Sequence, residues 1–141
     1  MRITSVTANY HRFAGAISAA PLRFWFTLED GRAFGVAGAS DGASIILDRA
    51  LDEPFSMDEA GEVLLVDVTQ SVLLSGSDEP LEDIRFLDWS SQHVGVRLGC
   101  RDGSVIYIWN ADDELKWGDE NALHQSWPDR TRPSVGDGVG L

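Results

Sequence analysis

Apolar and polar residues alternate along two stretches of this chain, 22–38 and 94–109, and an Asp-Gly pair interrupts each of them. Alternation with a period of two is typical of a strand with one buried face, and Asp-Gly favours a tight turn. The pattern predicts two antiparallel β-hairpins, turning at Asp30-Gly31 and Asp102-Gly103. We expect two-residue turns, in which both central residues have positive φ.

The two stretches also align as an approximate internal repeat. When the Asp-Gly pairs are superimposed, LRFWFTLEDGRAFGVAGASD (residues 22–41) lies over VGVRLGCRDGSVIYIWNADD (residues 94–113). The apolar positions agree on both sides of the turn, so that Phe24 aligns with Val96 and Val36 with Ile108. A repeat of this kind indicates two copies of one structural unit.

Other elements are predicted from shorter signals. Strands are expected at residues 3–10, 62–69 and 81–89, where β-branched and other apolar residues are frequent. Short helical turns are expected at 56–59, where Ser56 and Glu59 have capping-box spacing, and at 69–74, where Thr69 can cap and Gly76 can stop the helix.

The chain after Trp127 reads PDRTRPSVGDGVGL, whose prolines and glycines argue against regular structure. We therefore expect residues 128–141 to form a flexible tail behind a single globular domain, residues 1–127. The predicted fold class is α+β, mainly β: an antiparallel sheet built around two similar hairpins, with minor short helices.

Composition and charge exclude several classes of function but say little more about the fold. The formal net charge of −12 on 141 residues disfavours direct binding to nucleic acid or to an anionic membrane surface. No apolar run approaches the roughly 20 residues that cross a bilayer, and the N-terminus lacks the apolar core of a signal peptide. A single cysteine, Cys100, excludes an internal disulfide. These features predict a cytoplasmic protein.

Candidate catalytic and metal-binding residues were tested against known spacings. Cys100 shares the alternating face of Val96 and Leu98, which predicts a buried, unreactive thiol. The histidines are scattered, and no nucleophile elbow or phosphate-binding loop is present. An EF-hand loop starting at Asn110 fails, because Leu115 and Asn121 occupy its glycine and glutamate positions. We expect no catalytic residues, no metal site and no cofactor.

An acidic run follows the second hairpin, and we interpret it as a partner-binding surface. It consists of Asp112, Asp113, Glu114, Asp119 and Glu120, with Trp117 as an apolar anchor. The hairpin itself has apolar residues on both faces, Ile106 and Ile108 on one and Val105, Tyr107 and Trp109 on the other. Either it is sandwiched inside the domain, which we favour, or one face is an exposed aromatic patch.

The segment VGVRLGCRDGSVIYIWNADDELKW, preceded by SMDEAGEVLLVDVTQ, resembles small acidic bacterial proteins with this strand, turn and strand plan. Some proteins of that kind look like immunity partners of secreted toxins. The resemblance implies a non-enzymatic protein-binding module, an immunity-type inhibitor that covers a basic surface of a cognate toxin. Two alternatives stay open: an acidic nucleic-acid mimic that inhibits a host or phage enzyme, and a small-ligand-binding or hydrolytic β-domain.

Overall fold

The computed structural model describes residues 2–48, 55–56, 62–72, 80–127 and 132–139. Its elements in chain order are β1 (Ile3–Phe13), β2 (Ala16–Ile17), β3 (Arg23–Leu28), β4 (Ala33–Gly38), β5 (Ile45–Asp48), β6 (Phe55–Ser56), β7 (Glu62–Asp67), α1 (Thr69–Val72), β8 (Leu81–Trp89), β9 (Gln92–Cys100), β10 (Val105–Ala111), β11 (Glu114–Gly118), α2 (Glu120–Ser126) and β12 (Ser134–Gly138). All strand pairs are antiparallel, and both helices are short, so the predicted fold class is confirmed.

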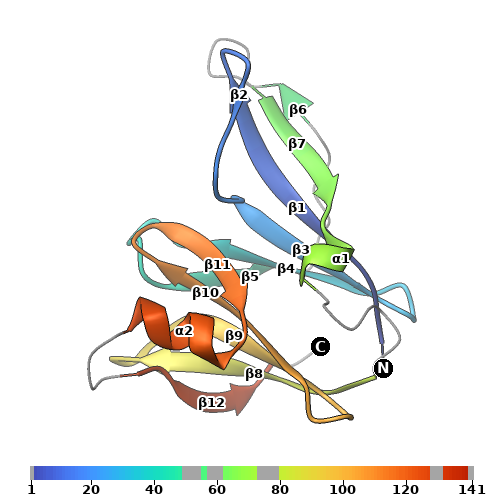
Figure 1. Ribbon diagram of the computed structural model, residues 1–141, viewed down its shortest axis with the longest axis vertical. Coiled ribbons are helices and arrows are strands. Elements are labelled where there is room, and N and C mark those ends of the chain that lie inside the picture. The colour runs from blue at the N-terminus through green and yellow to red at the C-terminus, as the bar shows by residue number, and fades with distance from the viewer. Residues whose placement is uncertain (1, 49–54, 57–61, 73–79, 128–131, 140–141) are drawn as a thin grey trace.

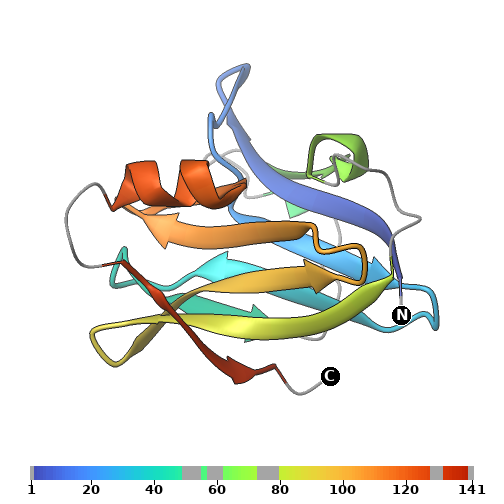
Figure 2. The ribbon, with the colours of Figure 1, turned by 60° about the horizontal axis from the view of Figure 1, so that its bottom comes forward.

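The strands form two sheets that pack face to face (Figures 1 and 2). The first sheet has seven strands in the order β5-β4-β3-β1-β7-β6, with β2 beside β1, and the second has five in the order β11-β10-β9-β8-β12. A single cluster of buried apolar side chains joins them. From the first sheet it contains Val6, Ala8, Phe24, Phe26, Phe34 and Val36, and from the second Ile84, Val96, Leu98, Ile108 and Leu115.

Both predicted hairpins are present, and their registers confirm the internal repeat. Phe24 pairs with Val36 in the β3–β4 hairpin. The aligned residues Val96 and Ile108 pair in the same way in the β9–β10 hairpin. The repeat extends further, because β5-β4-β3-β1-β7 and β11-β10-β9-β8-β12 follow one plan, in which a fifth strand returns to lie beside the first.

The two Asp-Gly turns differ in type from the expectation. Gly31 and Gly103 have φ of +87° and +92°, but their aspartate neighbours are not among the residues with positive φ. In the first turn, the Gly31 amide donates to Leu28 O at 2.9 Å and the Leu28 amide to Arg32 O at 2.8 Å. This is a three-residue loop ending in a left-handed glycine, so the expectation of positive φ at both central residues is wrong. Asp30 instead accepts a hydrogen bond from the Arg32 amide at 3.0 Å, as aspartates in turns often do.

The second hairpin is sandwiched, as we favoured. Ile108 is fully buried in the cluster between the sheets. Trp109 on the opposite face is 1% exposed because α2 covers it, and its indole N–H donates to Ser126 Oγ at 2.9 Å. Leu123 of α2 joins Trp109 in a second apolar cluster on that outer face. The aromatic patch considered as an alternative is therefore absent from this hairpin.

Most of the remaining predictions are confirmed where the structure describes the chain. Strands β1, β7 and β8 occupy the three segments expected to be extended, and α1 begins at Thr69 as predicted. Of the helical turn expected at 56–59, Ser56 belongs to β6, and residues 57–59 lie outside the described residues. The predicted end of the second helix, residues 73–76, also lies outside them.

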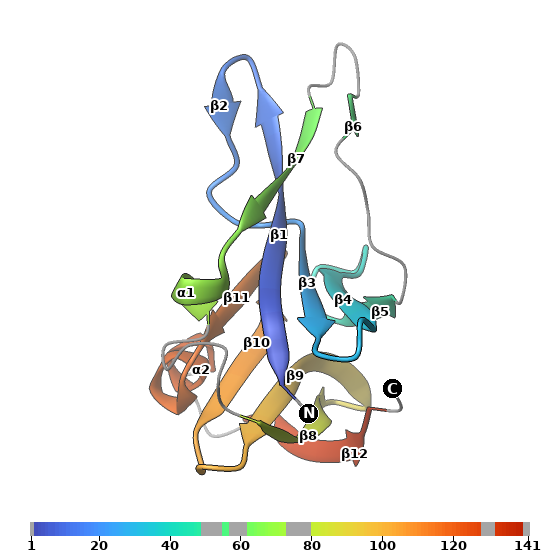
Figure 3. The same ribbon diagram turned by 90° about the vertical axis from the view of Figure 1, so that its right-hand side faces the viewer.

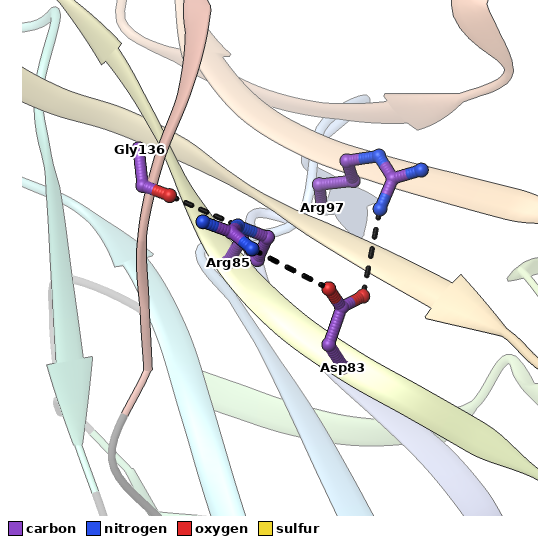
Figure 4. A network of polar contacts seen from close by, with 4 residues as sticks. All are labelled: Asp83, Arg85, Arg97 and Gly136. Carbon is purple, nitrogen blue, oxygen red and sulfur yellow. Dashed lines mark hydrogen bonds and ion pairs between the residues drawn. The ribbon is translucent and has the colours of Figure 1, made fainter.

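The segment after Trp127 was expected to lack regular structure, and for residues 134–138 this is wrong. They form β12, which pairs with β8. Arg85 anchors the strand by donating from Nε to Gly136 O at 3.0 Å, while Asp83 holds Arg85 and Arg97 (Figure 4). A Cβ at residue 136 would clash with the carboxylate of Asp88, so the glycine permits the close approach of the strands.

The first sheet extends beyond the second. The distal half of β1 continues with β2, β6 and β7 into an arm that protrudes from the sandwich (Figures 1 and 3). Four large apolar residues of the arm and its base are exposed, and sequence analysis did not single them out: Phe13, Ile17, Leu22 and Val66.

Candidate functional site

The acidic run begins at the turn between β10 and β11. Asp112 and Asp113 have φ of 53° and 61°, so they form a two-residue turn with both central residues in the left-handed region. Aspartate tolerates this backbone conformation better than most residues. Both side chains and that of Glu114 are exposed, so three consecutive carboxylates project into solvent.

The corresponding loop of the first repeat meets this turn. Asp113 donates its amide hydrogen to Gly42 O at 3.0 Å, which links the β10–β11 turn to the β4–β5 loop. Asp41, which aligns with Asp113 in the repeat, is also exposed. A Cβ at Gly38 would lie 3.0 Å from Nδ2 of Asn110, its aligned residue. The two repeats therefore contact each other at this point.

We call this cluster of Asp41, Asp112, Asp113 and Glu114 the acidic end. Asp41 is its most rigidly held carboxylate, because it accepts hydrogen bonds from the Ser44 hydroxyl at 2.6 Å and from the Ser44 and Ala43 amides at 2.8 and 2.9 Å. These bonds, above all the one from the Ser44 side chain, lower the pKa of Asp41 to about 2. The carboxylate therefore remains charged well into the acidic range.

The pKa of Asp41 gives a testable prediction. We expect an NMR titration of its side-chain carbon to show a midpoint of about 2, and Ser44→Ala to raise that midpoint towards 3.8. Between these pH values the unfolded chain binds more protons at this residue than the folded chain does, so its contribution to stability is lost as the pH falls. A wild-type midpoint near 3.8 would show that the loop does not hold the carboxylate.

The other predicted acidic residues lie elsewhere. Asp119 and Glu120 follow β11, and five extended residues separate them from the turn by about 16 Å of chain. Asp119 caps α2, accepting a hydrogen bond from the Ala122 amide at 3.0 Å. Glu120 is exposed in the first helical turn, with its carboxylate 3.5 Å from His124 Nε2. The run that looks continuous in sequence is therefore divided into two groups by β11.

Trp117, the expected apolar anchor, is not freely exposed. It is only partly buried, yet its ring packs edge-on against Phe24 with the ring centres 5.3 Å apart. It thus extends the apolar cluster between the sheets to the margin of the sandwich. A ring fixed in this way can present a rigid apolar edge to a partner without losing rotamer freedom on binding.

A groove of about 750 Å³ passes along this margin. Strand β11 lies between the connection from β2 to β3 and α2 (Figure 1), and residues of all three line the groove. Its lining comprises Ala19, Ala20, Pro21, Trp109, Asp112, Glu114, Leu115, Lys116, Trp117, Ala122, Gln125 and Ser126. Asp112 and Glu114 connect the groove to the acidic end, so rigid aromatic surface and exposed carboxylates lie side by side.

The other sites considered from sequence were located in the structure. Cys100 is buried at 8% exposure, as predicted. In the described ranges, no three His, Cys, Asp or Glu side chains are arranged to hold a metal ion. Asn110, the start of the rejected calcium loop, is buried and donates from Nδ2 to Ser44 O at 2.9 Å. Its amide nitrogen thereby joins the two repeats.

Comparisons with known proteins yielded nothing: no family model, curated protein or solved structure matches this chain. Among the helices of the described residues, none has the length and apolar character needed to span a membrane.

Sequence analysis identified three of the four carboxylates of the acidic end and missed the fourth. Asp112, Asp113 and Glu114 stood out because they are consecutive. Asp41 was not singled out, although the repeat alignment placed it opposite Asp113. Ala19–Pro21 have no sequence signal for this role, because they line the groove together with a strand almost a hundred residues later.

Proposed function

We propose that this protein is a non-enzymatic protein-binding module, an immunity-type inhibitor that acts in the cytoplasm by covering a basic surface of a cognate toxin. The observation that carries the proposal is the acidic end, where carboxylates from both repeats are exposed beside a groove with fixed tryptophan rings. Such a surface supplies charge for encounter and apolar area for burial.

The charge distribution supports a basic partner. The chain carries a net charge of −12, so its field attracts cations from a distance. At the acidic end, the folded chain brings several negatively charged side chains into one region, and all of them are exposed. Lysine and arginine side chains of a partner would pair with these carboxylates, and the bidentate geometry of arginine matches a carboxylate.

A variant that removes charge without disturbing the turn tests the proposal. In Asp112→Asn/Asp113→Gly/Glu114→Gln, the turn becomes Asn-Gly, the pair most favoured in two-residue hairpins, and the amide that donates to Gly42 is kept. We expect an unchanged or raised melting temperature. The association rate with a partner captured from the source lysate at low salt should fall roughly tenfold, and the difference should shrink at high salt.

The matched control removes three exposed carboxylates elsewhere, in Glu29→Gln/Glu82→Gln/Asp137→Asn. It changes the net charge by the same amount, so equal losses of association rate in the two variants would show that only total charge matters. The proposal is wrong if the acidic-end variant binds the captured partner as fast as the wild type at low salt.

A further inference from the structure

Strand β11 forms one edge of the second sheet. In the part of the chain that the structure describes, it pairs with β10 alone. Hydrogen-bonded and non-hydrogen-bonded pairs alternate along an antiparallel ladder, and the pair that flanks a two-residue turn is hydrogen-bonded. Ala111 and Glu114 are that pair. The main chain of Glu114, Lys116 and Gly118 therefore faces β10, and that of Leu115 and Trp117 points away from β10. Leu115 is 4% exposed and Trp117 is partly buried.

The groove described above follows this edge. Leu115 and Trp117, whose main-chain groups face outwards, are both in its lining. One wall, Ala19–Pro21, lies on the side of the first sheet, and Gln125 of α2 lies on the other. An edge strand between two walls is the arrangement in which proteins bind extended peptides by adding a strand. Five residues of β11 match an extended segment about 16 Å long.

The charged residues that line the groove favour binding of a basic segment. Asp112 and Glu114 line it next to the turn, and Asp113 stands beside them with its side chain exposed. The one cation in the lining, Lys116, lies two residues beyond Glu114. A Lys or Arg side chain near the turn would be complementary to the carboxylates, whereas an acidic segment would meet repulsion there.

We propose that the groove along β11 binds an extended segment of a partner protein that carries Lys or Arg, and that this segment joins the second sheet as an added strand. The inference rests on the proposed function and states how the basic partner is held. Main-chain hydrogen bonds to Leu115 and Trp117 supply binding that does not depend on the partner's side chains, and the acidic end supplies selectivity for basic segments.

Because the partner is unidentified, the probe is an acetylated, amidated ten-residue peptide of alternating Val and Arg. Its counterpart of alternating Val and Glu is the charge control. We expect saturating Val-Arg peptide to slow amide hydrogen exchange at Leu115 and Trp117 at least tenfold, because these amides gain hydrogen bonds. Exchange at Glu114 and Lys116, which already face β10, should change much less, and the Val-Glu peptide should have no effect.

A groove-filling variant separates strand addition from simple charge attraction. Ala19→Trp adds bulk to one wall and leaves the carboxylates in place, so it should weaken binding of the Val-Arg peptide at least tenfold. Ala16→Trp, at an exposed β2 position outside the groove lining, should bind as the wild type does.

Strand addition is overturned if the Val-Arg peptide fails to bind or leaves exchange at Leu115 and Trp117 unchanged, or if Ala19→Trp binds it normally. The proposed function has a separate readout, the association rate of the neutralised acidic-end variant with the captured partner. If the acidic-end variant associates more slowly but Ala19→Trp binds the peptide normally, the protein has a charged binding surface and does not add a strand.

Discussion

Replacing Gly95 with alanine should destabilise the protein by about 3 kcal/mol or more, or prevent it from folding. A Cβ at this position would lie 2.3 Å from Ile108 O and 2.9 Å from Trp109 Cα. Both are main-chain atoms of the neighbouring strand β10, so no side-chain rotation relieves the clash. Relief requires β9 and β10 to separate, and these strands carry the buried residues of the second sheet.

The measurement is the midpoint of urea unfolding, with the soluble yield recorded in case the variant does not fold. Gly138→Ala is the matched control, since a Cβ there would meet nothing closer than Ile84 O at 3.9 Å. We expect its midpoint to stay close to that of the wild type. Equal midpoints for the Gly95→Ala variant and the wild type would contradict the tight pairing of these strands.

Removing the ring of Trp109 should have the second-largest effect, about 3 to 5 kcal/mol for Trp109→Ala. The ring is 1% exposed and packs with Leu87, Val94 and Leu123, so its loss leaves a cavity beneath α2. Because Trp109 also lines the groove, the variant should bind the Val-Arg peptide more weakly.

Trp109→Phe separates packing from hydrogen bonding. It keeps an aromatic ring but loses the N–H group that donates to Ser126 Oγ at 2.9 Å, so we expect the lost hydrogen bond to cost about 1 to 2 kcal/mol in addition to the cost of the smaller ring. Urea unfolding of both variants gives the comparison. If Phe were as destabilising as Ala, the hydrogen bond rather than ring packing would attach α2.

Features that depend on residues close together in the sequence were predicted more accurately than features that depend on distant residues. The hairpins were predictable because alternation and a turn glycine act over a few residues, and burial of Cys100 followed from its shared face with Val96 and Leu98. The turn type was missed because Asp30 and its neighbours form a three-residue loop, and Asp-Gly is compatible with more than one turn.

Strand β12 was missed for a different reason. Its residues, SVGDG, have low intrinsic β-propensity. The strand forms because the edge of β8 is available and Arg85 reaches Gly136 O, and because Gly136 has no side chain to strike Asp88. None of these partners is adjacent in sequence, so no local pattern could indicate them.

The sequence by itself determined the two hairpins, their common register and the three exposed carboxylates at Asp112–Glu114, because each depends on side-chain alternation or on backbone preferences within a turn. Only the tertiary structure decided that Asp41 joins those carboxylates, that Asp119 serves instead as a helix cap, and that β11 is an edge beside a groove. These depend on how the two repeats pack against each other. Burial of apolar side chains between the sheets sets that packing, and it joins residues that are far apart in the sequence.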